Sequence, residues 1–188
     1  MPNFYESEPI EKITTKLESD DFQKAYLFAE QYISSFHRRE VKAGICLTLA
    51  VLIGSTIPLY ANRFSSYWIP ICGVLCALAA SAFFFLKQPN IIKKWAKQLF
   101  ESNVLLRQEN EVTIFRDSIM IQNSYEKQQE YWTDFNQCLE NSNYYVLVGG
   151  MNRNLVVIKK QNLTSEQIST ISAHLLNTFA RCYHKSRR

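Results

Sequence analysis

The sequence has few of the residues from which reaction centres are built. It contains 3 histidines, which lack the spacing of metal ligands, and 5 cysteines. Cys72 and Cys76 lie one helical turn apart, as ligands of a soft metal could, but no histidine or further cysteine lies near them, and packing between helices is the favoured interpretation. The pair Gly149-Gly150 lacks the lysine and the helix that follow a phosphate-binding loop, so it predicts a turn. The cysteines form no disulfide framework, and we expect reduced thiols. These absences predict a protein without a metal or a cofactor.

Charge is also missing, from two long stretches of the chain. Residues 43–60 and 67–86 contain no charged side chain, and only six residues separate them. Each stretch has about the 20 residues needed to cross a bilayer core. Because ion and proton pathways need ionisable groups inside the membrane, their absence favours an anchor over a transporter. Small residues such as Gly73, Ala77 and Ser81 predict close packing as a helical hairpin, with self-association as the alternative.

The charges that are present predict an orientation. The first 36 residues carry three lysines and seven carboxylates, which fits neither a cleaved signal nor a nucleic-acid-binding arm. The loop between the apolar stretches contains a single basic residue, Arg63. Because basic residues stay in the cytoplasm, both termini are predicted to be cytoplasmic. The basic residues that flank the stretches are Arg38, Arg39 and Lys42 before the first, and Lys87, Lys93, Lys94 and Lys97 after the second.

The segments on either side of the apolar stretches show amphipathic patterns. Residues 10–17 alternate weakly as a strand, and residues 19–36 have helical spacing. Residues 91–106 predict a basic amphipathic helix that either lies on the membrane surface or packs on the following domain. The expected membrane-surface contacts are Lys87, Lys93, Lys94, Trp95 and Lys97.

The last third of the chain predicts a small sheet covered by a helix. Residues 112–121 alternate as a hairpin that turns at Arg116-Asp117, and further strands are expected near 125–131, 137–140, 144–148 and 155–159. Thr164 and Gln167 have the spacing of a capping box at the start of a final helix. The predicted organisation is an N-terminal segment (1–42), a transmembrane hairpin (43–86), a linker helix (87–106) and a cytoplasmic antiparallel α+β domain (107–188).

This order of elements resembles the YcxB-like family of bacterial membrane proteins. The matching features are Glu18-Ser19-Asp20-Asp21-Phe22, the stretch Val112 to Ile119, Tyr131-Trp132-Thr133-Asp134-Phe135 and the strand pair from Tyr144 to Lys160. The resemblance covers about residues 17–179. It implies location in the bacterial inner membrane and a pleckstrin-homology-like domain, which is a partial β-barrel closed by its last helix. It brings no catalytic residues.

Two sets of residues are candidates for a protein interface. Tyr144 and Tyr145 are adjacent on a strand, so they point to opposite faces, and we expect one of them to lie outside the core. Arg153, Lys159 and Lys160 form a candidate basic edge, for which an ordinary solvated strand pair is the alternative. Trp132 is expected in the core.

These observations predict a non-enzymatic inner-membrane protein that presents a regulatory or scaffolding protein-binding domain. An immunity protein against a toxin is one alternative. A membrane-surface enzyme is another, and it would have only Cys138, His174, Asp134 and Glu140 as reagents, which would need a shared cleft. The expected partners are the lipid bilayer, an unidentified protein and a second copy through the small-residue faces, but not nucleic acid.

Overall fold

The chain forms two compact units. The computed structural model describes residues 8–33, 38–64, 67–151 and 155–186. Residues 1–25 and 97–188 make up one unit, called here the sheet unit, and residues 26–96 make up the helical unit. The boundaries fall inside two helices, α1 (Ser19–Ile33) and α5 (Gln88–Ser102). The sequence division at residues 42 and 107 does not foresee that the N-terminal strand belongs with the C-terminal domain.

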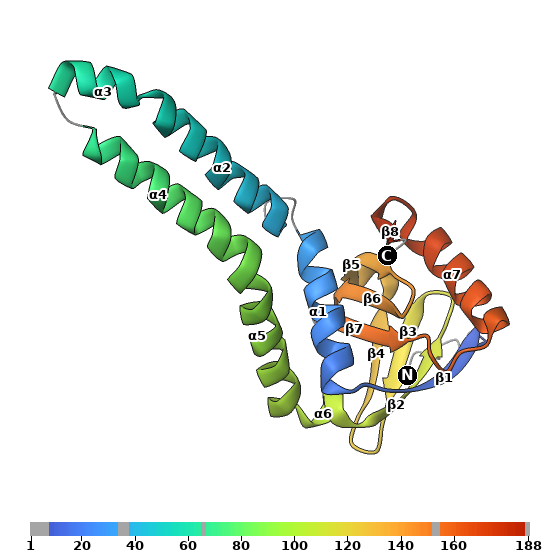
Figure 1. Cartoon of the computed structure of the whole chain (residues 1–188). Helices are drawn as coiled ribbons and strands as arrows, with labels where there is room; N and C mark the ends of the chain where they lie inside the picture. Colours follow the sequence, from blue (N-terminus) through green and yellow to red (C-terminus); the bar gives the residue numbers. More distant parts are fainter. Residues whose placement is uncertain (1–7, 34–37, 65–66, 152–154, 187–188) are drawn as a thin grey trace. The chain divides into compact units, whose positions relative to one another are not determined.

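The first sheet of the sheet unit joins segments from both ends of the chain (Figure 1). Its strands pair antiparallel in sequence order, and Ile13 of the first strand lies opposite Val112 of the second. Buried Ile13 and Thr15 alternate with exposed Lys12 and Thr14, as expected of a strand with one core face. The strands are β1 (Glu11–Lys16), β2 (Glu109–Ile114), β3 (Ser118–Gln122) and β4 (Lys127–Tyr131).

The second sheet has the order β7-β6-β5-β8. The strands predicted by alternation are confirmed, but they do not form one continuous meander. A short 3-10 turn, η3 (Trp132–Asp134), follows β4, and β5 pairs with β6 and β8 instead. The strand β8 runs parallel to β5 and was not predicted. The strands are β5 (Phe135–Glu140), β6 (Tyr144–Gly149), β7 (Leu155–Lys159) and β8 (Tyr183–Lys185).

Helix α7 (Ser165–Phe179) closes the core between the two sheets. Its predicted capping box is confirmed, because the Thr164 side chain accepts from the Gln167 N–H and the Gln167 side chain accepts from the Thr164 N–H. Three buried residues of α7 belong to the same core as inward residues of both sheets and as Trp132, which is buried as predicted. The three are Ile171, Leu175 and Phe179.

The second sheet is also buried on its other face. Leu139, Val146 and Val157 do not belong to the core under α7, yet at most 5% of each is exposed. Residues of the first turns of α1, Phe22 and Ala25, are buried as well. Contacts from Asp21 of α1 to β6 and β7 show that α1 lies on this face. The sheet is therefore enclosed between α7 and the first turns of α1.

The turn after β6 depends on glycine. Gly149 has φ +102°, and a Cβ built there would lie 2.8 Å from the backbone N of Asn136. We expect Gly149→Ala to lower the free energy of unfolding by about 1–3 kcal/mol, because backbone at this φ is strained for any other residue. Chemical denaturation followed by tryptophan fluorescence measures the change. Gly44→Ala is the control, since its Cβ meets open space; equal stabilities for both variants would contradict the prediction.

The helical unit contains two long apolar helices. Residues 39–64 comprise α2 (Arg39–Ser55) and α3 (Ile57–Phe64). Residues 68–102 comprise α4 (Trp68–Ala82), the π turn η2 (Phe83–Lys87) and α5. Both are long and apolar enough to cross a membrane by length and composition alone, a test that a core helix of a soluble protein also passes. In each of the two, however, only 11% of the most apolar 18-residue segment is buried.

Helices α2 and α4 pack against each other through small residues. Ala43, Ala50 and Ser81 are buried, and the Ser81 hydroxyl donates to the Ala43 carbonyl over 3.2 Å. A Cβ on Gly73 would lie 3.2 Å from the Ile53 side chain, so the backbones approach closely there. The packing of the two helices as a pair is therefore confirmed, and these small residues serve contacts within the chain.

Helix α5 differs from the helix predicted over residues 91–106. It continues α4 through the π turn that precedes Pro89, and it ends at Ser102. The Asn103 side chain then accepts from the Leu105 N–H and caps the short helix α6 (Val104–Arg107). Ala96 and Phe100 are its buried residues, and the Phe100 ring lies 5.7 Å from that of Phe22. The contact with Phe22 of α1 thus uses Phe100, a position that the sequence pattern did not single out.

Candidate functional site

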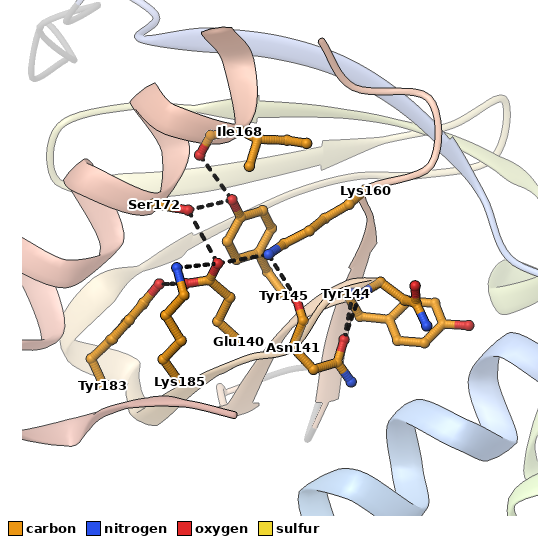
Figure 2. Close-up of polar contacts among 10 residues, drawn as sticks. Glu140, Asn141, Tyr144, Tyr145, Lys160, Ile168, Ser172, Tyr183 and Lys185 are labelled. Carbon is orange, nitrogen blue, oxygen red and sulfur yellow. Dashed lines mark hydrogen bonds and ion pairs between the residues drawn. The ribbon is translucent and has the colours of Figure 1, made fainter. Parts of the chain in front are cut away.

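One buried carboxylate connects three segments of the sheet unit. Glu140, at the end of β5, is 3% exposed. Its Oε1 lies 2.7 Å from Nζ of Lys160 and 3.0 Å from Nζ of Lys185 on β8 (Figure 2). The Tyr183 hydroxyl, also on β8, donates to Oε2. Glu140 thereby links the C-terminal strand to the loop after β7.

Tyr145 and Ser172 extend this group to α7. The Tyr145 hydroxyl donates to the Ile168 carbonyl over 2.9 Å and lies 2.6 Å from the Ser172 hydroxyl. The Lys160 ammonium lies 4.1 Å from the centre of the Tyr145 ring, within cation–π range. We call this set the Glu140 cluster: Glu140, Tyr145, Lys160, Ser172, Tyr183 and Lys185.

The Glu140 cluster holds its carboxylate ionised. Burial raises the pKa of Glu140, but hydrogen bonds from Lys160, Tyr183 and Lys185 outweigh that effect and leave the pKa below its ordinary value. Burial also raises the pKa of Tyr145 to about 12, which keeps its hydroxyl protonated as a donor. Burial and the bond to Glu140 raise the pKa of Tyr183. The cluster is thus a buried anion surrounded by donors.

A second polar group fastens α1 to the outer face of the same sheet. The Tyr144 hydroxyl donates to Oδ1 of Asp21 over 2.7 Å, and Nζ of Lys159 lies 2.6 Å from Oδ2. Burial raises the pKa of Asp21, while the bonds from Lys159 and Tyr144 lower it further than burial raises it. Burial and the bond to Asp21 raise the pKa of Tyr144. We call Asp21, Tyr144 and Lys159 the α1 clamp.

The structure corrects the predicted interface residues. Tyr144 and Tyr145 do point to opposite faces, but neither is exposed, at 4% and 0%, because α1 covers one face and α7 the other. Lys159 and Lys160 do not form an open basic edge, because each is paired with a carboxylate. Arg153 lies outside the described residues.

A polar pocket lies between the two groups. Its volume is about 450 Å³, and it brings together three of the residues proposed from the sequence: Tyr144, Lys159 and Lys160. The turn between β5 and β6 forms one wall, where the Asn141 side chain accepts from the N–H groups of Asn143 and Tyr144. The remaining lining residues are Asp21, Ser142, Asn143, Gln161 and Ile168. Both lysines are paired with carboxylates, so among the described residues that line the pocket neither lysine is left free for a phosphate.

The residues considered as reagents have structural roles. Cys138 is fully buried in the core, and burial raises the pKa of its thiol. Burial lowers the pKa of His174, whose ring contacts Trp132 with centroids 5.6 Å apart. The Asp134 side chain accepts from the Tyr131 N–H at the turn between the sheets. Within the described part of the chain, no three His, Cys, Asp or Glu side chains are grouped to hold a metal ion.

The proposed membrane-surface residues lie on the exposed side of α5 and at its approach. Trp95 is 69% exposed, together with Ile91 at 44% and Leu99 at 46%. Lys97 is paired with Glu101 one turn later, at 3.7 Å. The other three lysines, Lys87, Lys93 and Lys94, are exposed. The helix therefore has an uncovered apolar stripe bordered by positive charge.

No family model, curated protein or solved structure matches this chain. What the site can do therefore follows from its geometry. Sequence reasoning named Glu140 only as a reagent and missed the cluster around it. One signal was present, because Glu140 stands two residues after Cys138 and therefore faces the same core side of the strand. A charge at such a position predicts a buried partner.

Proposed function

We propose that this chain is an integral membrane protein whose paired helices anchor the sheet unit as a non-enzymatic, protein-binding domain. The observation that carries the proposal is the exposure of apolar side chains on the helix pair. Val51 is 72% exposed, Leu59 is 70% exposed and Leu75 is 59% exposed. Contiguous apolar surface of this kind is rare on soluble monomers, and lipid is the partner that its length fits.

The ends of the helix pair support the same proposal. Tyr67 and Trp68 are exposed at the start of α4, where amphipathic rings favour the headgroup region. At the other end, Lys87, Lys93, Lys94, Trp95 and Lys97 are suited to an anionic cytoplasmic leaflet, at about 1 kcal/mol for each lysine near the surface. This charge distribution favours cytoplasmic termini and a sheet unit in the cytoplasm.

The arrangement of the sheet unit favours a binding role. Two antiparallel sets of strands, β1 to β4 and β5 to β7, are followed by a helix that closes their core, which supports a pleckstrin-homology-like domain. The helix pair is inserted in the sequence between β1 and β2, which pair with each other. The sheet unit is therefore connected covalently to the helix pair at two points. Cys138 and His174 are engaged in packing, and Asp134 is engaged in a turn. These roles favour a protein-binding function of the sheet unit over catalysis.

Membrane insertion is tested with charged variants. We expect the chain to stay in the membrane pellet after alkaline carbonate washing, and Val51→Lys/Leu75→Lys to reduce that fraction strongly. Each lysine at a helix centre opposes insertion by about 2.5–3.5 kcal/mol. Leu176→Lys is the matched control, since Leu176 is 51% exposed on α7. Recovery of the unmodified chain as a soluble monomer without detergent would contradict membrane anchoring.

Partner binding is tested by crosslinking in native membranes followed by purification in mild detergent. We expect one protein to be recovered in stoichiometric amount with the complete chain. A truncated control that keeps the helix pair and lacks the sheet unit should lose that protein. Recovery of no partner at stoichiometric level would overturn the binding role and leave the anchoring intact.

A further inference from the structure

The edge of β5 is occupied by the chain's own C-terminal segment. Three residues of β8 pair with it in parallel, with Tyr183 opposite Cys138 and Lys185 opposite Glu140. The Ser186 N–H then donates to the Glu140 carbonyl over 2.7 Å. Without β8, the backbone groups at the end of β5 would form an open sheet edge of the kind to which extended peptides add.

The segment that provides β8 is short, and its backbone pairing with β5 spans three residues. It follows a break after α7 where Ala180 has φ +42°, a left-handed conformation that strains a residue with a side chain. Arg181 and Cys182 are exposed between this break and the strand. A three-residue parallel pairing contributes few ladder bonds, and parallel pairing is slightly less stable per residue than antiparallel pairing. The strand can therefore open without unfolding of the sheets behind it.

Two side chains of β8 make specific polar contacts with Glu140. The Tyr183 hydroxyl and the Lys185 ammonium both meet the Glu140 carboxylate, one at each oxygen (Figure 2). The two residues are separated by one, so both point to the same side of an extended strand. Glu140 is held ionised in place by Lys160, which makes it a fixed acceptor for a hydroxyl and a cation.

We propose that the edge of β5 and Glu140 form a docking site for an extended basic peptide of a partner protein, and that β8 occupies this site within the chain. The peptide adds as a strand and places an aromatic hydroxyl and, two residues later, a lysine against Glu140. The proposal rests on the proposed protein-binding function and names its site. The choice of a basic segment follows from β8 itself, since Glu140 receives the Lys185 ammonium and the Tyr183 hydroxyl in addition to its ion pair with Lys160.

The test uses the complete chain in detergent micelles with a protease site inserted between Ala180 and Arg181. After cleavage, a fluorescent peptide with the sequence of residues 180–186 is titrated under reducing conditions and followed by anisotropy. We expect the cleaved chain to bind it, and the uncut chain to bind at least ~10-fold more weakly, because the tethered strand competes at high effective concentration. A peptide carrying Y183F and K185A should bind at least ~10-fold more weakly than the parent.

Several outcomes would overturn the proposal. The first is a cleaved chain that keeps its circular dichroism spectrum and does not bind the peptide, and the second is equal binding of the Y183F/K185A peptide. Concentration-dependent dimers formed by exchange of β8 in the uncut chain would assign the site to a second copy instead. Peptide binding by the purified chain is independent of any native partner, so its failure is distinguishable from failure of the crosslinking experiment.

Hydrogen exchange on the uncut, unmodified chain covers the case in which cleavage unfolds the domain. We expect the Ser186 amide to exchange at least ~100-fold faster than the amides of Val146 and Leu147 on the central strand β6, because β8 opens locally. Equal protection of these amides would show that β8 opens only with the whole domain, and would overturn the proposal.

Discussion

Glu140→Gln should lower the free energy of unfolding of the sheet unit by about 3–5 kcal/mol, since removing one partner of a buried ion pair leaves the other charge uncompensated. Glu140 and Lys160 have side chains that are 4% and 7% exposed. Glutamine keeps the shape of the side chain and removes only its charge, so the change isolates the electrostatic contribution. Urea denaturation in detergent micelles, followed by tryptophan fluorescence, measures it.

A matched control and a double variant sharpen this measurement. Lys185→Ala removes the exposed partner of the same carboxylate, at 62% exposure, and should cost less than about 1 kcal/mol. Glu140→Gln/Lys160→Met removes both buried charges, and we expect it to recover much of the loss. A single Glu140→Gln variant as stable as the parent would contradict the burial of an ion pair in the core.

The same pair gives the domain a pH dependence of known sign. Because the pKa of folded Glu140 lies below its ordinary value of 4.5, its contribution to stability is complete above pH 4.5. The contribution is lost as the pH falls through the lower pKa of the folded state. Asp21 has a lowered pKa as well, so Glu140→Gln should weaken the acid dependence without abolishing it.

Phe22→Ala is expected to have an effect of similar size, about 3–5 kcal/mol, from the loss of a buried aromatic ring. Phe22 is 2% exposed, its ring lies 5.7 Å from that of Phe100, and it lines a small pocket together with Leu17 and Val157. It therefore supports the packing of both α1 and α5. The same urea experiment measures the loss.

Tyr125→Ala is the control for Phe22→Ala. Tyr125 is also aromatic and belongs to the sheet unit, but it is 69% exposed, and we expect a change within about 0.5 kcal/mol. Equal effects of the two substitutions would contradict the packing of α1 on the sheet. Hydrogen exchange of the β6 amides provides an independent measure, since loss of the α1 cover should speed their exchange.

Local pattern predicted most of the elements of this fold. Alternation located the strands, and the spacing of Thr164 and Gln167 located the start of α7, because these signals depend on neighbours within a few residues. The exposure of Tyr144 could not be predicted in the same way. Alternation assigns it to the face opposite Tyr145, but whether that face is covered depends on α1, which is distant in sequence.

The candidate site was predicted less well than the fold. Tyr145 and Lys160 were among the candidate interface residues, whereas the structure gives them partners inside the domain, from α7 and from β5. The strand β8 has only three residues, which pair with β5. A segment of this length is too short to show a detectable alternation of polar and apolar residues. Pairings between distant segments are set by tertiary packing and leave little trace in local sequence.

The pairing of β1 with β2 also sets an order of events during synthesis. Residues 17–108, which include the proposed anchor, are made after β1 and before β2 is complete. Closing this long connection has an entropic cost, and nonlocal pairing of this kind is slow. The first sheet therefore cannot close until the whole helical unit has been synthesised. A closed first sheet thus marks a chain in which the segment between β1 and β2 is already complete.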